Sequence, residues 1–354
     1  MSIQKFKAIG LMSGTSLDGL DIAYCIFERN ETEWSFGIEN AISISYSEEW
    51  KSRLREAFNA SALELIALDH DLGTLHGKWV KSFIDTHQLS VDFVASHGHT
   101  VFHQPEKGIT VQIGHPSKIA AVTGLTVVAD FRTLDVALGG QGAPLVPIGD
   151  RLLFSQYDAC LNLGGIANIS FEKNNERIAF DIAPCNMLWN VLSQRLGMDF
   201  DKDGELARSG KVRNDLLEKW NGYSFYTQEA PKSLGREFFE SHFAADLKAE
   251  ADISDLMATA TEHIADQIAT VVNAANIKKL LVSGGGARNI FFIEKLKEKC
   301  PCEVIIPEEL LLDFKEALVF AFLGVLRISN QINTLSSVTG ASRDSIGGSV
   351  WIGD

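Results

Sequence analysis

The sequence lacks several features that would favour particular classes of function. Cysteine occurs only five times in 354 residues, and this odd number, mostly in apolar runs, indicates free thiols in a reducing cytoplasm. There is no Lys/Arg-rich run and the formal net charge is -14, which disfavours nucleic acids and anionic membranes as partners. The longest apolar run, residues 317–326, is too short to span a bilayer and predicts a buried helix.

Two common nucleotide-binding signatures are also missing. The sequence contains no G-x-x-x-x-G-K-[ST] motif, which argues against a P-loop, and no G-x-G-x-x-G motif, which argues against a Rossmann fingerprint. An acidic chain of this kind must therefore bind phosphate through local backbone N–H groups, a metal ion or a few placed cations.

Glycine-rich turns between apolar strands divide the chain into two similar halves. The first half opens with strands at residues 6–12 and 20–27, and the second has strands at 159–163 and 166–171. Helical patterns follow in both halves, and 45% of the residues are hydrophobic, enough for two cores. We therefore expect a duplicated α/β protein with one domain at residues 1–130 and another at 131–354.

Three glycine-rich motifs are candidates for nucleotide binding, although each alone would also fit a solvated loop. Glycines let the backbone approach an anion, and successive N–H groups can cradle phosphate. The first motif adds hydroxyl donors and a carboxylate able to hold Mg²⁺, and the third lets a helix N-terminus approach phosphate. The residues concerned are Ser13, Gly14, Thr15, Ser16, Asp18 and Gly19, then Gly164, Gly165 and Asn168, and finally Gly284, Gly285, Gly286 and Asn289.

Asp181 is the candidate general base. It ends an apolar strand predicted at residues 177–181, and partial burial would raise its pKa toward a useful range. The alternative is a cap for the helix predicted at residues 186–196, and the sequence pattern by itself leaves both open.

The order of the three motifs resembles the phosphate-1, phosphate-2 and adenosine motifs of the actin/hexokinase superfamily. Within that superfamily, several stretches resemble the anhydro-N-acetylmuramic acid kinases: GLMSGTSLDGLD (10–21), SHGHT (96–100), QIGHPSKIA (112–120), VVADFRTLDVALGGQGAPLVP (127–147), LNLGGIANIS (161–170) and PKSLGREF (231–238). The resemblance implies a two-lobed, actin-like ATPase (ribonuclease H-like) fold with a cleft for nucleotide and sugar between the lobes.

The same resemblance implies a reaction. ATP, with Mg²⁺, would phosphorylate 1,6-anhydro-N-acetylmuramic acid while water opens the anhydro ring, as a step of peptidoglycan recycling. Asp181 would activate that water, and Mg²⁺ would be held through Asp18 and Glu316. The residues expected to contact the sugar are Ser96, His97, Arg132, Gln141, Lys232 and Ser233.

Two of these expectations have alternatives. Arg132 could bind the lactyl carboxylate of a muramic acid as a bidentate fork, or it could form a surface ion pair with Asp135. His97, His99 and His103 could contact the sugar, serve the structure or bind a metal ion. His97 and His99 share one strand face only if the strand continues through Gly98.

The sequence departs from the family pattern at several positions. The family motif D-T-G-P-G-N reads Asp181-Ile182-Ala183-Pro184-Cys185-Asn186 here, His99 replaces a usual Gln, and Leu234 replaces a usual Thr. Two other functions therefore stay open: a plain sugar kinase in which Asp181 deprotonates a hydroxyl, and a nucleotide-binding sensor without catalysis. The oligomeric state is also open, with a homodimer as one option.

Overall fold

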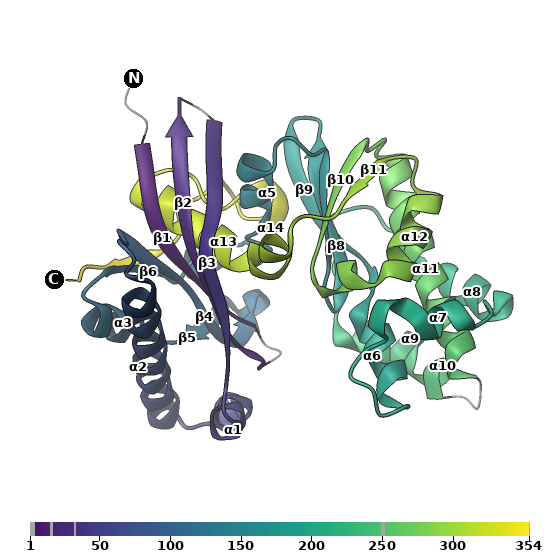
Figure 1. Cartoon of the computed structure of the whole chain (residues 1–354), viewed down its shortest axis with the longest axis horizontal. Helices are drawn as coiled ribbons and strands as arrows, with labels where there is room; N and C mark the ends of the chain where they lie inside the picture. The colour runs from purple at the N-terminus through teal and green to yellow at the C-terminus, as the bar shows by residue number, and fades with distance from the viewer. Residues whose placement is uncertain (1–3, 15–16, 32, 249–251, 354) are drawn as a thin grey trace. The chain divides into compact units, whose positions relative to one another are not determined.

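A computed structural model describes residues 4–14, 17–31, 33–248 and 252–353. The chain forms two compact units: unit 1 comprises Met1–Leu153 and Phe314–Asp354, and unit 2 comprises Phe154–Asp313 (Figure 1). The division expected after residue 130 differs from this one. Residues 131–153 stay with the first unit, and the chain returns to it for its last 41 residues (314 to 354).

Unit 1 is built on a seven-stranded sheet in the order β12-β6-β4-β1-β2-β3, with β5 paired to β4. Strands β1, β2 and β3 run antiparallel, whereas β4 and β6 are parallel to β1. The strands are β1 (Gln4–Ser13), β2 (Gly19–Asn30), β3 (Glu33–Ser45), β4 (Phe93–Gln104), β5 (Ile109–Ile113), β6 (Thr126–Ala129) and β12 (Ser349–Trp351).

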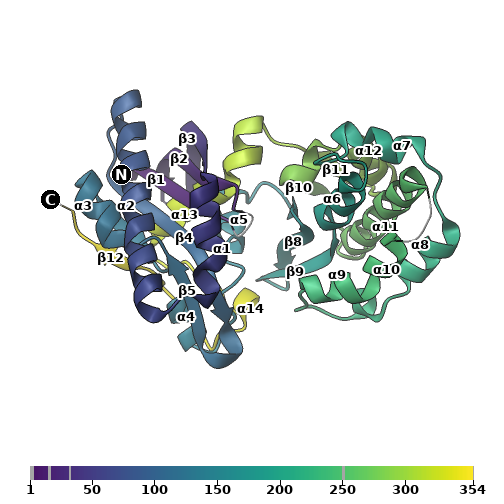
Figure 2. The ribbon, with the colours of Figure 1, turned by 90° about the horizontal axis from the view of Figure 1, so that it is seen from below.

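Helices cover both faces of this sheet (Figure 2). On one face, α2 and α3 pack Val80 and Ile119 against Ile9 and Val94 of the central strands. On the other face α13 lies so close that a Cβ added to Gly10 would fall 1.9 Å from the Ala317 carbonyl oxygen. The helices are α1 (Glu48–Glu56), α2 (Ala62–His87), α3 (Pro116–Thr123), α4 (Thr133–Ala137), α5 (Pro147–Leu153), α13 (Glu309–Ile328) and α14 (Ser336–Thr339).

Unit 2 is built on a five-stranded sheet in the order β11-β10-β7-β8-β9. The long helix α11, with 13 of its 22 residues buried, contacts α6, α12 and β9 in the core of the unit. The strands are β7 (Ala159–Leu163), β8 (Ile166–Lys173), β9 (Glu176–Pro184), β10 (Lys279–Ser283) and β11 (Glu303–Ile305). The helices are α6 (Asn186–Gln194), α7 (Glu205–Ser209), α8 (Asn214–Asn221), α9 (Arg236–His242), α10 (Ala244–Lys248), α11 (Ile253–Ala274) and α12 (Ile290–Lys299).

The two sheets repeat one topology. In unit 1 the order β6-β4-β1-β2-β3 has two parallel pairs followed by two antiparallel pairs, and in unit 2 the order β11-β10-β7-β8-β9 has the same directions. Each unit therefore starts with an antiparallel trio and adds parallel strands at the first strand of that trio. This duplication confirms the predicted α/β, actin-like fold class.

Most of the helices and strands predicted from local sequence patterns are present in the structure. Ser61 and Glu64 form a capping box at the start of α2, with both reciprocal hydrogen bonds present. Two elements extend beyond their predicted ends: β9 runs on to Pro184, and α13 starts at Glu309 with a kink at Phe314. None of the helices in the described part of the chain is both long and apolar enough to cross a membrane.

Candidate active site

The connection between β1 and β2 in unit 1 is the first predicted phosphate motif. Its carboxylate, Asp18, is exposed. Gly19 allows β2 and β3 to approach closely, because a Cβ there would lie 2.1 Å from the carbonyl oxygen of Ile44 on β3. Thr15 and Ser16 lie outside the described residues, so the structure adds nothing to their predicted roles.

Ser13, at the end of β1, belongs to a buried polar network, whereas the adjacent Gly14 is half-buried. The Ser13 hydroxyl lies 2.9 Å from the Tyr46 hydroxyl and 3.2 Å from Nδ1 of His99. The Tyr46 hydroxyl also lies 2.8 Å from Nε2 of His76. Burial lowers the pKa of His76 to about 3 and that of His99 to about 4, so both rings are neutral at pH 7.

Among the roles considered for His99, the structure favours the structural one. Its side chain is only 3% exposed and turns toward Ser13. Strand β4 does continue through Gly98, but the left-handed φ of 74° at that glycine interrupts the regular alternation of side chains. His97 consequently turns toward Arg132, and His103 contacts the Thr110 hydroxyl at 3.2 Å instead of sharing a metal site.

Arg132 is held in a fixed orientation by two acceptors. Its Nε and Nη2 lie 3.2 Å and 2.8 Å from Nε2 of His97, and its Nη1 donates to the carbonyl oxygen of Gly142 at 2.5 Å. The His97 ring is neutral, because burial and the nearby guanidinium lower its pKa to about 3, and its Nδ1 donates to the Gly98 carbonyl. Burial lowers the pKa of Arg132 to about 10, so the guanidinium stays charged at pH 7 and has N–H groups left for a ligand.

Asp135 does not form the surface ion pair considered for Arg132. It is buried, and its carboxylate accepts hydrogen bonds from the Gly142 N–H and the Thr339 hydroxyl, both at 2.7 Å. Gln141, beside Gly142, is exposed, and its backbone N–H donates to the Thr339 carbonyl. Asp135 therefore fixes the backbone of residues 139–142, and the Gly142 carbonyl of this segment accepts the hydrogen bond from Arg132.

Acidic groups gather near the middle of α13. The Glu316 carboxyl reaches the surface although many protein atoms surround it, and this partial desolvation raises its pKa. Lys315 and Arg132 oppose the rise, whereas the negative charge of Asp21 on β2 adds to it. Lys315 itself is buried and pairs with Asp150 at 2.7 Å. The sequence did not predict Asp21, Lys315 and Asp150 as members of this charged group.

In unit 2 the second motif is the turn between β7 and β8. The Gly164 and Gly165 carbonyls accept hydrogen bonds from the N–H groups of Asn186 and Cys185, at 3.1 Å and 2.8 Å. A Cβ added to Gly165 would meet nothing within 4 Å, so this residue faces open space. Asn168 follows on β8 and is half-buried.

The third motif packs directly against the second. A Cβ on Gly284 would fall 2.9 Å from the Leu163 carbonyl oxygen, and one on Gly286 would fall 2.8 Å from the Leu163 Cβ. Gly285 has no such restriction, with its nearest contact at 3.7 Å. The Asn289 side chain accepts from the Phe292 N–H at 2.9 Å and so caps α12. Unit 2 thus brings the second and third motifs together, although they lie more than 100 residues apart in the sequence.

Asp181 lies within β9, and its register partner is Asn168 on β8. Its Oδ2 accepts a hydrogen bond from the Leu234 N–H at 2.8 Å, and its own N–H donates to the Lys232 carbonyl at 3.1 Å. Burial raises the pKa of Asp181, and the Leu234 N–H opposes that rise. The alternative role as a helix cap does not hold, because α6 has Cys185 at its N-cap and no side-chain cap.

The segment that holds Asp181 also positions a cation. Nζ of Lys232 donates to the Phe225 carbonyl at 3.1 Å and lies 4.7 Å from the centre of the Phe225 ring. Burial lowers the pKa of Lys232. Ser233 is exposed, and the Leu234 side chain is buried, so the sequence change at Leu234 leaves its backbone contact to Asp181 in place.

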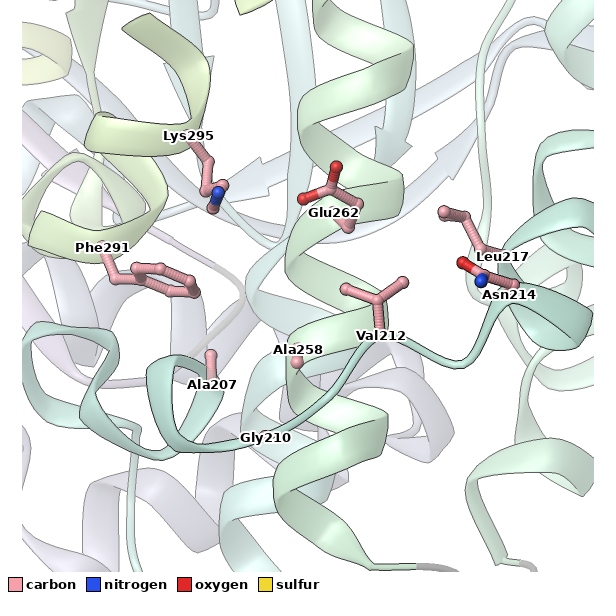
Figure 3. Close-up of a pocket in the computed structure, with 9 residues that line it drawn as sticks. All are labelled: Ala207, Gly210, Val212, Asn214, Leu217, Ala258, Glu262, Phe291 and Lys295. Carbon is pink, nitrogen blue, oxygen red and sulfur yellow. The ribbon is translucent and has the colours of Figure 1, made fainter. Parts of the chain in front are cut away.

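Unit 2 also contains a pocket of about 400 Å³ that the sequence reading did not anticipate. Figure 3 shows its lining residues on α7, α8, α11 and α12 and on the segment between α7 and α8. Helix α12 begins directly after the third motif, and a Cβ on Gly204 next to α7 would fall 2.2 Å from Oδ1 of Asn289. The lining residues are Ala207, Gly210, Val212, Asn214, Leu217, Ala258, Glu262, Phe291 and Lys295.

Comparison with known proteins gives the family. Residues 6–353 match the model of the family described as anhydro-N-acetylmuramic acid kinase. The chain belongs to this family. The anhydro-N-acetylmuramic acid kinase of Clostridioides difficile (strain 630) is 35% identical, with 97% of each chain covered. That of Sulfurovum sp. (strain NBC37-1) is 34% identical, with 99% of this chain and 100% of the relative covered. The predicted family and class of enzyme, a phosphotransferase, are confirmed.

Solved structures show weaker similarity. The activator of 2-hydroxyisocaproyl-CoA dehydratase from Clostridium difficile, with bound ADPNP, has a TM-score of 0.44 and 13% identity, covering 92% of this chain and 97% of that one. A ROK family glucokinase from Streptomyces griseus, in complex with glucose and AMPPNP, has a TM-score of 0.39 and 12% identity, covering 90% of this chain and 98% of that one.

Proposed function

We propose that this enzyme uses ATP to phosphorylate 1,6-anhydro-N-acetylmuramic acid while water opens the anhydro ring, giving N-acetylmuramic acid 6-phosphate and ADP in peptidoglycan recycling. The family match supports the substrate class. The observation that carries the mechanism is Asp181, a partly buried carboxylate with a raised pKa, held by backbone hydrogen bonds on both sides.

In this mechanism Asp181 takes a proton from the water that attacks the anomeric carbon. The C1–O6 bond breaks, and the electron pair of that bond goes to O6. The charge that develops on O6 makes it a good acceptor for the γ-phosphoryl group at that moment. A general base of this kind contributes about 10²–10⁴-fold to the rate. Arg132 would bind the lactyl carboxylate of the sugar with the N–H groups that His97 and Gly142 leave unused.

The nucleotide would be bound by the glycine motifs. Open space at Gly165, and the absence of a close contact at Gly285, fit the approach of phosphate or a flat ligand to the backbone. We propose that the pocket in Figure 3 receives the nucleoside part of ATP. It has an ordinary size for a small-molecule site, and Phe291 and Lys295 in its wall belong to the helix that follows the third motif.

The oxygen donors in unit 1 fit a magnesium ion. Asp18 is exposed, and the Glu316 carboxyl is affected by the charge of Asp21, so a hard divalent cation would relieve that repulsion. We propose that Asp18 and Glu316 hold Mg²⁺, through waters, with Asp21 nearby. When bound, Mg²⁺ would neutralise charge on the triphosphate.

The decisive experiment measures ADP and new reducing ends together, with ATP, Mg²⁺ and 1,6-anhydro-N-acetylmuramic acid. We expect one reducing end for each ADP. ADP without reducing ends would instead indicate a plain sugar kinase, in which Asp181 deprotonates a hydroxyl. The absence of ADP, with ATP still bound, would indicate a nucleotide-binding sensor.

A further inference from the structure

A second group of metal-binding side chains lies in unit 1, outside the residues assigned above. Asp69 and His70 are neighbours on α2, and His115 lies in the turn between β5 and α3. One potential ligand atom from each of these half-buried residues lies within 4.8 Å of the others. Within the described residues, this is the one group of three His, Cys, Asp or Glu side chains close enough to share an ion.

The backbone around this group is fixed by the two elements that supply it. Oδ1 of Asp69 accepts a hydrogen bond from the Gly114 N–H at 2.7 Å, and the Asp69 carbonyl accepts one from the His115 N–H at 3.0 Å. The turn is also tight, because a Cβ added to Gly73 would lie 2.5 Å from the His115 carbonyl oxygen. The carboxylate is therefore oriented by backbone N–H groups of the turn that carries His115.

The two histidine rings of the group lie against each other. The His70 and His115 rings are stacked, with centroids 4.5 Å apart, and within the described part of the chain no hydrogen bond involves the ring of His70. Nδ1 of His115 lies 2.8 Å from the Ser117 hydroxyl. The Ser117 N–H also donates to this nitrogen at 3.3 Å, so in the metal-free protein Nδ1 is an acceptor. A metal ion on Nε2 would move the ring proton to Nδ1, which would then donate to the Ser117 hydroxyl as an outer hydrogen-bond partner.

We propose that Asp69, His70 and His115 form a zinc-type site that binds one divalent transition-metal ion, separate from Mg-nucleotide. Two imidazoles and one carboxylate with an open fourth position are a common ligand set for Zn²⁺. Bond lengths of about 2.0–2.1 Å separate two tetrahedral ligand atoms by about 3.4 Å, so the atoms need to move together by at most about 1.5 Å. Rotation of the half-buried side chains supplies this movement.

The bound ion would join α2 to the start of α3. His115 also packs edge-on against Trp351 of β12, with ring centroids 5.3 Å apart, so the site lies next to the strand that follows α14. Binding to the folded state alone should therefore stabilise unit 1, and the melting temperature should rise with the concentration of free Zn²⁺. Because no nucleotide contact is involved, this effect should not require ATP.

The test uses the full-length protein, freed of metal with a chelator and without nucleotide. Calorimetric titration with Zn²⁺ should show one saturable site, and Co²⁺ should give the visible absorption of a four-coordinate ion. His70→Gln and Asp69→Asn should each weaken Zn²⁺ binding at least about tenfold, since even outer partners of metal ligands contribute 10–100-fold. Asp69→Asn keeps an oxygen acceptor for the Gly114 N–H, so it tests the charge without removing the turn contact.

His87→Gln is the matched control, because His87 is exposed on the same helix and outside the group. It should bind Zn²⁺ as the wild type does. Circular dichroism of the metal-free variants checks that they are folded. The proposal is overturned if the wild type shows no saturable Zn²⁺ binding, or if folded His70→Gln and Asp69→Asn bind as tightly as His87→Gln.

Discussion

The backbone N–H of Leu234 donates a 2.8 Å hydrogen bond to Oδ2 of Asp181. The contact does not depend on the side chain at position 234, so leucine supplies it as well as the threonine usual in the family would. Within the described residues no hydrogen bond reaches Oδ1 of Asp181. One oxygen is thus oriented, and the other is left to accept a proton from a water molecule.

Asp181→Asn should lower kcat by about 10²–10⁴-fold while ATP and sugar binding change little, because the amide keeps the shape and loses the basicity. Single-turnover kinetics and equilibrium binding measure the two effects separately. Asp199→Asn, which changes an exposed carboxylate of the same unit, should leave the rate unchanged. A variant at Asp181 that keeps more than half of the wild-type rate would place the base elsewhere.

The pH dependence should reflect the raised pKa of Asp181. A general base acts in its deprotonated form, so kcat/KM should fall as the pH drops through that pKa. The acid limb of the profile should therefore lie at a higher pH than an ordinary aspartate, with a pKa of about 3.9, would give. The profile of kcat/KM against pH measures this directly, and an acid limb at or below the ordinary value would contradict the assignment.

Gly165→Val should weaken ATP binding without unfolding the protein. The side chain would occupy the open space at the turn, where phosphate would have to approach the backbone. Gly37→Val on β3 is the control, because its added Cβ meets only the end of the flexible Glu39 side chain. ATP affinity measured by calorimetry should fall for the first variant alone, and equal affinities would show that the turn does not contact phosphate.

The elements that the sequence predicted are those with strong local signals. The hairpins at residues 6–27 and 159–171 were found because apolar strands flank glycine-rich turns. Strand β3 was missed because it is a largely half-exposed edge strand whose apolar alternation is interrupted by Gly37 and polar residues. The return of the C-terminal residues to unit 1 was also missed. It depends on contacts between residues far apart in the sequence, such as Gly10 and Ala317, which local patterns do not predict.

The candidate site shows the same limit. Arg132 and Asp181 could be proposed from their motifs, but their partners could not. His97 lies 35 positions from Arg132, and Leu234 lies 53 positions from Asp181, so only the folded chain brings them together. The orientation of His99 could not be predicted either, because the reversal of side-chain direction depends on the backbone conformation of Gly98.

Arg132→Lys should raise KM for 1,6-anhydro-N-acetylmuramic acid by about 10–100-fold, because a charge-assisted pair contributes about 1.5–3 kcal/mol and lysine lacks the planar fork. The matched substrate is 1,6-anhydro-N-acetylglucosamine, which has no lactyl carboxylate. For that sugar, KM should be similar in the wild type and the variant. An equal loss on both sugars, measured by steady-state kinetics, would contradict a carboxylate contact.

His99→Gln should make the stability of the protein less sensitive to acid. Burial lowers the pKa of His99 from 6.5 to about 4, so the folded state binds a proton there less readily than the unfolded chain. Stability is therefore unaffected by this residue above pH 6.5 and is lost as the pH falls toward 4, by up to about 3 kcal/mol. Glutamine does not titrate, and its amide can still donate to or accept from the Ser13 hydroxyl.

The measurement is urea unfolding of the wild type and His99→Gln between pH 7.5 and about 4.5. Burial is the main cause of the lowered pKa of His76 and of His97, and it is present in both proteins, so most of their contribution cancels in the difference. The free energy of unfolding should fall more steeply with decreasing pH in the wild type, and the difference should appear below pH 6.5. Parallel curves would mean that His99 is not held neutral by the fold. A steeper fall in the variant would mean that the protonated ring is the stabilised form, and that His99 has an acidic partner.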